Sequence, residues 1–260
     1  MKEMMKRVMN PILPGALLSA VLLLSSCHSS YEVAKVEGRR IPMDAAWDAV
    51  PDVEAQALLA PYKRQIDSVM YSVVGTVAVS MDRFRPESPL SNLVADVLRE
   101  AAVEVLGAPA DMGLVNVGGI RNSLTEGPLT TGNIFELLPF ENSLCVLSMK
   151  GAAMKRLFQN IASRGGEGVS GVQLTMTRKG ELLQASIGGK PIEDDRTYTV
   201  ATIDYLADGN DGMTALMQAD KRECPAGATL RSLFIKYVEK QTAAGKKIAA
   251  QIEGRVTVKE

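Results

Sequence analysis

The residues of this chain that could take part in ligand chemistry gather in three short segments. In the first, an apolar run at 112–115 ends in Asn116, Gly118, Gly119 and Arg121. Such a run is typical of a strand that ends in a tight loop. Glycines let backbone amides come close to a ligand, asparagine donates and accepts hydrogen bonds, and the planar fork of arginine suits phosphate or carboxylate. These four residues are candidate binding residues. The alternative is a tight turn with an exposed arginine.

The other two segments place an aromatic residue beside proline, glycine or aspartate. In Leu-Leu-Pro-Phe140, the proline stiffens the loop that presents Phe140, and a rigid aromatic can stack on a planar ring. In Asp204–Gly212, Tyr205 can form the other face of such a clamp, and Asp208 and Asp211 can accept hydrogen bonds. The alternatives are core packing for Phe140 and a plain turn or calcium site for the last segment, which lacks the EF-hand spacing.

The first segment lacks two common phosphate-binding motifs. Its glycines do not have the G-x-G-x-x-G spacing of dinucleotide-binding folds, and no Gly-Lys-Ser/Thr follows. The 260 residues are 46% hydrophobic and carry a formal net charge of −1, without a cluster of basic residues. This composition is sufficient for a globular core and gives no support to nucleic-acid binding.

The N-terminus has the pattern of a secretory signal. Three basic residues precede an apolar run at 17–24, which is too short to span a bilayer comfortably. Leu-Ser-Ser-Cys27 follows and resembles a bacterial lipobox, whose cysteine is lipidated after cleavage. We therefore predict a lipoprotein signal peptide at 1–26, lipid attachment at Cys27 and a tether at 27–50. The protein would be anchored to a bacterial membrane in the cell envelope, periplasmic or surface-exposed. The alternative is a plain signal peptide with a chance cysteine.

The chain has two further cysteines, Cys145 and Cys224, which lie far apart in the sequence. Two cysteines do not make a disulfide framework. Cys145 falls in an apolar, strand-like run, and this context favours a buried thiol. A disulfide is the alternative in an oxidising envelope.

Helical and alternating periodicities are mixed along the chain from residue 51 to residue 260. A helical lead-in begins near Asp52, and Pro61 interrupts it and starts a second helical run. Ser88-Pro89 predicts the start of a helix that Gly107 ends. Further helices are predicted near 131–138, 154–161 and 230–238, and strands at 71–80, 112–115, 144–149, 172–177, 182–187, 198–202 and 255–259. This order indicates a single α+β domain at 51–260 with a mixed β-sheet and flanking helices.

Five motifs, in their order, resemble the C-terminal domain of the 5′-nucleotidase family. They are Glu87-Ser-x-Leu-x-Asn92, Asn116-x-Gly-Gly-Ile-Arg121, Leu-Pro-Phe140, Tyr198-Thr-Val-Ala-Thr202 and Tyr205-Leu-Ala-x-Gly-x-Asp-Gly212. The resemblance covers roughly residues 50–255. It implies the fold of that domain and a role in binding a nucleotide substrate.

The resemblance also implies a role for each matching residue. Phe140 and Tyr205 would hold the base between them, and Asp211 would hold the ribose hydroxyls. Asn116 and Arg121 would contact base or phosphate.

An arginine ahead of the Glu-Ser segment would hold phosphate in the family. Arg83 and Arg85 are both candidates for it, because the match is out of register there. Val117 and Asn210 stand where the family usually has glycine, and Tyr205 where it usually has phenylalanine. These departures are expected to alter base preference or to weaken binding.

In that family, hydrolysis takes place in a separate N-terminal domain that holds two divalent metals through Asp, His and Asn. This sequence has one histidine, His28, so neither a two-metal site nor a Ser-His-Asp triad has support. We predict no catalytic residue, metal site or cofactor in this chain.

The resemblance then implies one half of a split 5′-nucleotidase in nucleotide catabolism. This chain would bind the nucleotide or nucleoside, and a separate metallophosphoesterase chain would hold the divalent metals. The alternatives are a non-catalytic envelope lipoprotein that binds nucleotides or nucleosides, and a structural lipoprotein that has lost the pocket.

Overall fold

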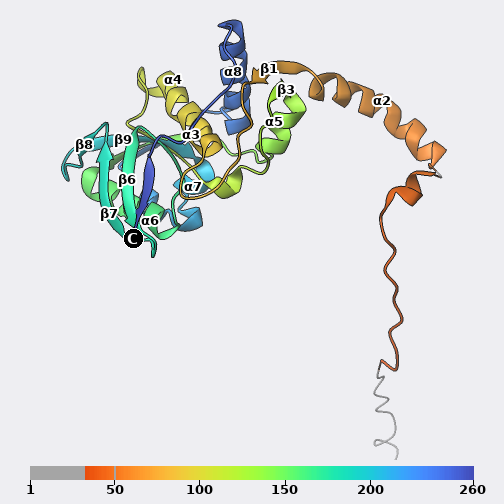
Figure 1. The fold of residues 1–260 in the computed structure, drawn as a ribbon, viewed down its shortest axis with the longest axis horizontal. Helices are drawn as coiled ribbons and strands as arrows, with labels where there is room; N and C mark the ends of the chain where they lie inside the picture. The colour runs from red at the N-terminus through yellow and green to blue at the C-terminus, as the bar shows by residue number, and fades with distance from the viewer. Residues whose placement is uncertain (1–32, 50) are drawn as a thin grey trace, which may run out of the picture. The chain divides into compact units, whose positions relative to one another are not determined.

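The computed structural model describes residues 33–49 and 51–260, so the predicted signal peptide and Cys27 lie outside the described residues. Its contacts divide the chain into two units, Met1–Val53 and Glu54–Glu260. The first contains the short 3-10 helix η1 (Ala45–Ala49), and the elements after α2 (Val53–Met70) belong to the second (Figure 1). Within the described ranges, no helix is both long enough and apolar enough to cross a membrane.

A five-stranded sheet in the order β10-β4-β9-β2-β5 forms the centre of the second unit. Its strands are β2 (Met112–Val115), β4 (Leu144–Lys150), β5 (Gly168–Ser170), β9 (Thr197–Ile203) and β10 (Lys221–Glu223). β2 and β9 run parallel, and the other neighbours run antiparallel. Every residue of β2 and β5 is buried, which is why β2 is a continuous apolar run rather than an alternating one.

Two smaller sheets complete the strand structure. β1 (Val73–Val77) pairs with β3 (Gly127–Thr130), and the other sheet has the order β11-β6-β7-β8. The strands of that sheet are β6 (Val172–Thr177), β7 (Leu182–Ile187), β8 (Lys190–Pro191) and β11 (Val256–Lys259). The predicted α+β class is confirmed, but the strands form three sheets rather than one. β3, β5, β8 and β10 have two to four residues each, too few to show an alternating pattern.

Helices cover the central sheet. The α-helices that follow α2 are α3 (Pro89–Ala101), α4 (Val103–Leu106), α5 (Thr131–Leu137), α6 (Gly151–Ser163), α7 (Asp204–Ala207) and α8 (Leu230–Ala243). The short 3-10 helices are η2 (Val117–Gly119), η3 (Asn210–Gly212) and η4 (Thr214–Gln218). α3 packs on β2, β5 and β9, and α6 packs on β4 and β9. The apolar faces of these elements join in one buried cluster.

Pro61 does not interrupt the lead-in helix, so the prediction of two helical runs was wrong. α2 continues from Val53 to Met70 with Pro61 inside it. A proline inside a helix leaves one backbone carbonyl without its usual donor. Because α2 has no buried residue, that carbonyl can bond to water instead, and the helix tolerates the proline.

Cys145 is not a free thiol, and the prediction of a buried thiol was wrong in this respect. Cys145 is buried as expected, but it forms a disulfide with Cys224. The pairing of β10 with β4 sets Glu223 opposite Val146, and this register brings the two cysteines together. The two residues are 79 positions apart, so no local pattern in the sequence reveals the pairing.

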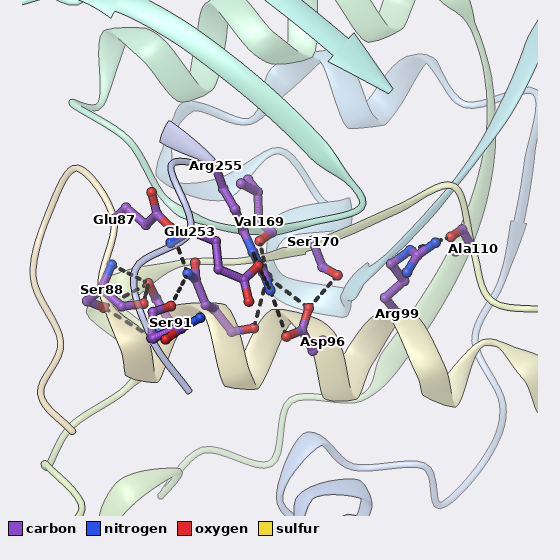
Figure 2. A network of polar contacts seen from close by, with 12 residues as sticks. Glu87, Ser88, Ser91, Asp96, Arg99, Ala110, Val169, Ser170, Glu253 and Arg255 are labelled. Atoms are coloured by element: carbon purple, nitrogen blue, oxygen red, sulfur yellow. Dashed lines mark hydrogen bonds and ion pairs between the residues drawn. The ribbon is translucent and has the colours of Figure 1, made fainter. Parts of the chain in front are cut away.

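A network of polar contacts joins the start of α3 to the C-terminal strand (Figure 2). The carboxylate of Glu87 accepts hydrogen bonds from the backbone amides of Glu253 (2.8 Å) and Val256 (3.2 Å). Farther along α3, Asp96 accepts two hydrogen bonds of 2.8 Å from Arg255. Burial alone would lower the pKa of Arg255, but its contacts with Asp96 and Glu253 raise that pKa above its usual range. The contacts of Glu87 fix the chain just ahead of α3, and this segment carries Arg83 and Arg85.

The N-terminus of α3 has the serine cap that Ser88-Pro89 predicts (Figure 2). Ser88 Oγ accepts from the amide of Ser91, and Ser91 Oγ accepts from the amide of Ser88, both at 3.2 Å. We expect Ser88→Ala to lower the free energy of unfolding by about 1 kcal/mol, since a helix N-cap contributes that much. Urea denaturation measures the change. Ser163→Ala, at an exposed site in α6, is the control and should change it by less than about 0.5 kcal/mol.

Candidate functional site

All three segments singled out in the sequence contribute to one pocket of about 380 Å³. Its lining residues are Arg85, Asn116, Gly118, Gly119, Phe140, Asn142, Arg164, Tyr205 and Asp211. The pocket follows from the topology of the central sheet. The parallel strands β2 and β9 lead into the first and third segments, and β4, which pairs with β9 through Leu144 and Ile203, starts after the second. The three loops therefore meet at one edge of the sheet.

Both aromatic residues of the predicted clamp line the pocket and are partly exposed. Phe140 is 49% exposed and Tyr205 is 39% exposed, so Phe140 is not a core residue. Asn210 donates to the backbone carbonyl of Tyr205 at 2.9 Å and supports the loop of the third segment. Exposed aromatic rings beside polar groups favour the stacking of a planar ligand. Asp208 does not line the pocket and instead forms an ion pair with Arg222.

Asp211 joins the first and third segments by direct contact. Its Oδ2 accepts a hydrogen bond of 2.8 Å from Asn116 Nδ2. Its Oδ1 lies 3.4 Å from both the hydroxyl of Tyr205 and Nη2 of Arg164. The backbone of Asp211 has a φ of 53°, a conformation uncommon for residues other than glycine and enriched at binding sites. The carboxylate is therefore held in a defined place in the pocket wall.

Gly118 and Gly119 have different roles in the turn η2. Neither has a positive φ, so left-handed backbone is not the reason for glycine here. A Cβ on Gly119 would lie 2.7 Å from Oδ1 of Asn116, whereas a Cβ on Gly118 would meet nothing within 4 Å. Gly119 is needed because Asn116 packs directly against it.

This difference gives a matched pair of substitutions. Gly119→Ala forces Asn116 to move, and we expect it to lower the free energy of unfolding by about 1–3 kcal/mol, the usual cost of overpacking. Gly118→Ala should be neutral or stabilising by up to about 1 kcal/mol, because it meets no neighbour and restricts the unfolded chain. Urea denaturation of both variants measures the difference. Equal losses would show that contact with Asn116 is not what requires Gly119.

Of the three candidate arginines, Arg85 lines the pocket and the other two do not. Arg85 Nε donates to the carbonyl of Gly166 at 2.8 Å, and its Nη2 lies 2.5 Å from Glu167. Arg83 is half-buried outside the lining. Arg121 is exposed, and its Nη1 donates to a backbone carbonyl of η2 at 3.0 Å. Arg121 therefore supports the turn from outside, and contact of any of the three with a ligand stays a prediction.

Sequence reasoning missed two residues of the lining, Asn142 and Arg164, and a third behind it, Glu167. Asn142 lies two residues after Phe140 in the same loop. Its polar side chain beside the predicted aromatic residue was a signal that could have marked it as a binding residue. Arg164 and Glu167 flank Gly165-Gly166, a glycine pair that follows the helix predicted near 154–161. Opposite charges on both sides of a glycine pair were the signal at this place.

The formal charges at the pocket balance. Arg85 and Arg164 both lie within 4 Å of the carboxylate of Glu167, and Arg164 also lies within 4 Å of the carboxylate of Asp211. The pocket therefore offers hydrogen-bond donors, acceptors and two aromatic faces rather than a strong field of one sign. Within residues 33–49 and 51–260, no three His, Cys, Asp or Glu side chains come together in a group that could hold a metal ion.

Two curated relatives are similar to most of this chain. It is 29% identical over 236 residues to the trifunctional nucleotide phosphoesterase protein YfkN of Bacillus subtilis (strain 168), covering 83% of this chain and 16% of that protein. It is 31% identical over 235 residues to the cell wall protein Lmo0130 of Listeria monocytogenes, covering 80% of this chain and 30% of that protein.

A solved structure also matches the fold. The 5′-nucleotidase precursor from Thermus thermophilus superposes with a TM-score of 0.67 at 28% identity, covering 81% of this chain and 44% of that one. The chain thus spans less than half the length of these three relatives. The family model for the 5′-nucleotidase C-terminal domain matches residues 73–218, more than half of the chain. By this match, together with the fold, the chain belongs to the 5′-nucleotidase C-terminal domain family.

Proposed function

We propose that this chain binds a nucleotide or nucleoside in the pocket and is the substrate-specificity half of a split 5′-nucleotidase. The observation that carries the proposal is the convergence of Phe140, Tyr205 and the Asn116–Asp211 pair on one cavity. The two rings would stack on the base. Asp211, already an acceptor for Asn116, would accept hydrogen bonds from the ribose hydroxyls. Arg85 would hold the phosphate through a charge-assisted hydrogen bond.

The metal chemistry would belong to a separate metallophosphoesterase chain. The sequence has one histidine, whereas hydrolysis with two metals draws on imidazole and carboxylate ligands together. The matched part of the relatives is less than half of each protein, which is consistent with chemistry supplied from outside these residues. This chain would then bind and orient the substrate, and the partner would supply divalent metals and the attacking water.

The proposed location is the cell envelope, through a lipid on Cys27. The order Leu-Ser-Ser-Cys27 after an apolar run supports it. The Listeria relative is named as a cell wall protein, which fits an envelope location. Labelling of the expressed protein with a radioactive fatty acid tests the anchor. Incorporation that is lost in Cys27→Ala supports it, and unlabelled protein contradicts it.

Phosphate release from AMP tests the division of labour. We expect the purified chain to release no phosphate with Mn²⁺ or Zn²⁺, and to support release when a metallophosphoesterase from the same organism is added. Turnover by this chain alone would contradict the split enzyme. Binding of AMP without turnover in either mixture would favour a non-catalytic binding protein instead.

A further inference from the structure

Glu167 lies behind the pocket, and its side chain is 0% exposed. It follows Gly165 and Gly166, whose φ values of 77° and 97° end α6 and turn the chain inward. A Cβ on Gly166 would lie 2.4 Å from the carbonyl oxygen of Pro86. This loop therefore packs directly against the segment that carries Arg85, and only glycine permits that approach.

The two carboxylate oxygens of Glu167 bind different parts of the pocket wall. Oε1 lies 2.5 Å from Nη2 of Arg85 and 3.6 Å from Nε of Arg164. Oε2 accepts a hydrogen bond of 2.6 Å from the backbone amide of Val117, the first residue of η2. A fully buried carboxylate is costly unless it is paired and hydrogen-bonded. Here the partners that offset this cost come from the segment before α3, from η2 and from the end of α6.

Glu167 engages only part of the guanidinium of Arg85. Arg85 donates through Nε to Gly166 and through Nη2 to Glu167, and no acceptor for its Nη1 is found among the described residues. A guanidinium group is planar, so fixing one edge also fixes the direction of the other. Since Arg85 lines the pocket, its remaining donors are held in one orientation at the pocket wall.

We propose that Glu167 is a positioning residue of this pocket, which holds Arg85 and the turn η2 so that Arg85 can donate to an anionic group of the ligand. Glu167 acts through Arg85 and Val117 and does not touch the ligand itself. The inference rests on the proposed function, because it assigns the effect of Glu167 to nucleotide binding.

Calorimetric titration of Glu167→Gln tests this role. The glutamine has nearly the same shape, but its NH₂ group must face one of the N–H donors that the carboxylate now accepts. We expect the affinity for AMP to fall about tenfold, the size of a lost charge-assisted hydrogen bond. The affinity for adenosine, which has no phosphate, should fall by less than about threefold. Glu193→Gln is the control, because it also removes a carboxylate from an arginine, Arg196, and lies outside the pocket lining. It should leave both affinities unchanged.

A double-mutant cycle separates positioning from general destabilisation. If Glu167 acts through Arg85, then Glu167→Gln in an Arg85→Ala background should change the AMP affinity by less than about threefold, since coupled residues are not additive. A full tenfold loss in that background would overturn the proposal. An unchanged AMP affinity in the single variant would overturn it as well. If Glu167→Gln does not fold, Glu167→Asp keeps the charge on a shorter side chain and is measured in the same way, with the same outcomes.

Nuclear magnetic resonance tests Glu167 independently of the proposed function. A hydrogen bond to a carboxylate shifts an amide proton downfield, so the Val117 amide should resonate downfield in the wild type and move upfield in Glu167→Gln. An amide that does not move would overturn the positioning role. If wild-type protein binds neither AMP nor adenosine, the proposed function fails. The Val117 signal then still tests whether Glu167 holds the turn η2 through its hydrogen bond.

Discussion

Replacing both Phe140 and Tyr205 with alanine is expected to lower the affinity for adenosine by about a hundredfold or more. Stacking of a base on an aromatic side chain contributes about 1–3 kcal/mol, so the loss of two such contacts is about 2–6 kcal/mol, and about 2.8 kcal/mol corresponds to a hundredfold. Each single variant should lose about tenfold. Both rings are partly exposed in the pocket, so the expected loss is in binding rather than in folding.

Calorimetric titration with adenosine measures this effect, and thermal unfolding checks that the variants are folded. Tyr71→Ala is the control, because Tyr71 is 72% exposed and lies outside the pocket. Its affinity for adenosine should equal that of the wild type. Wild-type affinity in the double variant would mean that the base binds somewhere else, or that stacking is not how it is held.

Loss of the disulfide between Cys145 and Cys224 is expected to lower the free energy of unfolding by about 2–4 kcal/mol. The bond joins residues 79 positions apart, so it removes many conformations from the unfolded chain. It also ties the three-residue strand β10 to β4 in the central sheet. Cys224→Ser is the preferred variant, because Cys224 is exposed whereas Cys145 is buried.

Urea denaturation with and without a thiol reductant measures this loss. The reductant should lower the stability of the wild type to the level of Cys224→Ser and should not change the variant further. Two results together would show that the bond does not stabilise the protein. The reductant would leave the stability of the wild type unchanged, and the wild type would be no more stable than Cys224→Ser.

The sequence predicted the elements whose signals are local. Ser88 and Gly107 mark both ends of a helical stretch, and the apolar run before Asn116 marks β2, because caps and periodicity act within a few residues. What it could not predict depends on distant partners. β5 and β10 are three residues long and exist because longer strands pair with them. The disulfide partner of Cys145 follows from the pairing of β10 with β4.

The residues of the candidate site also differ in how far local sequence could predict them. Residue types and loop chemistry made Asn116, Phe140, Tyr205 and Asp211 candidates, and the family resemblance assigned their roles. All four line the pocket. Neither the residue types nor the resemblance could separate Arg83 from Arg85. That choice depends on contacts of Arg85 with residues 81 and 82 positions later in the chain. Sequence position alone does not carry this information, because tertiary packing sets which side chain reaches the pocket.

Calorimetric titration of the purified wild-type protein with adenosine, AMP and ribose 5-phosphate tests the proposed binding function most directly. We expect one saturable site per chain for adenosine and for AMP, and much weaker binding of ribose 5-phosphate, which has no base to stack between Phe140 and Tyr205. The absence of saturable binding for both adenosine and AMP would contradict the proposed function, and so would ribose 5-phosphate binding as tightly as AMP.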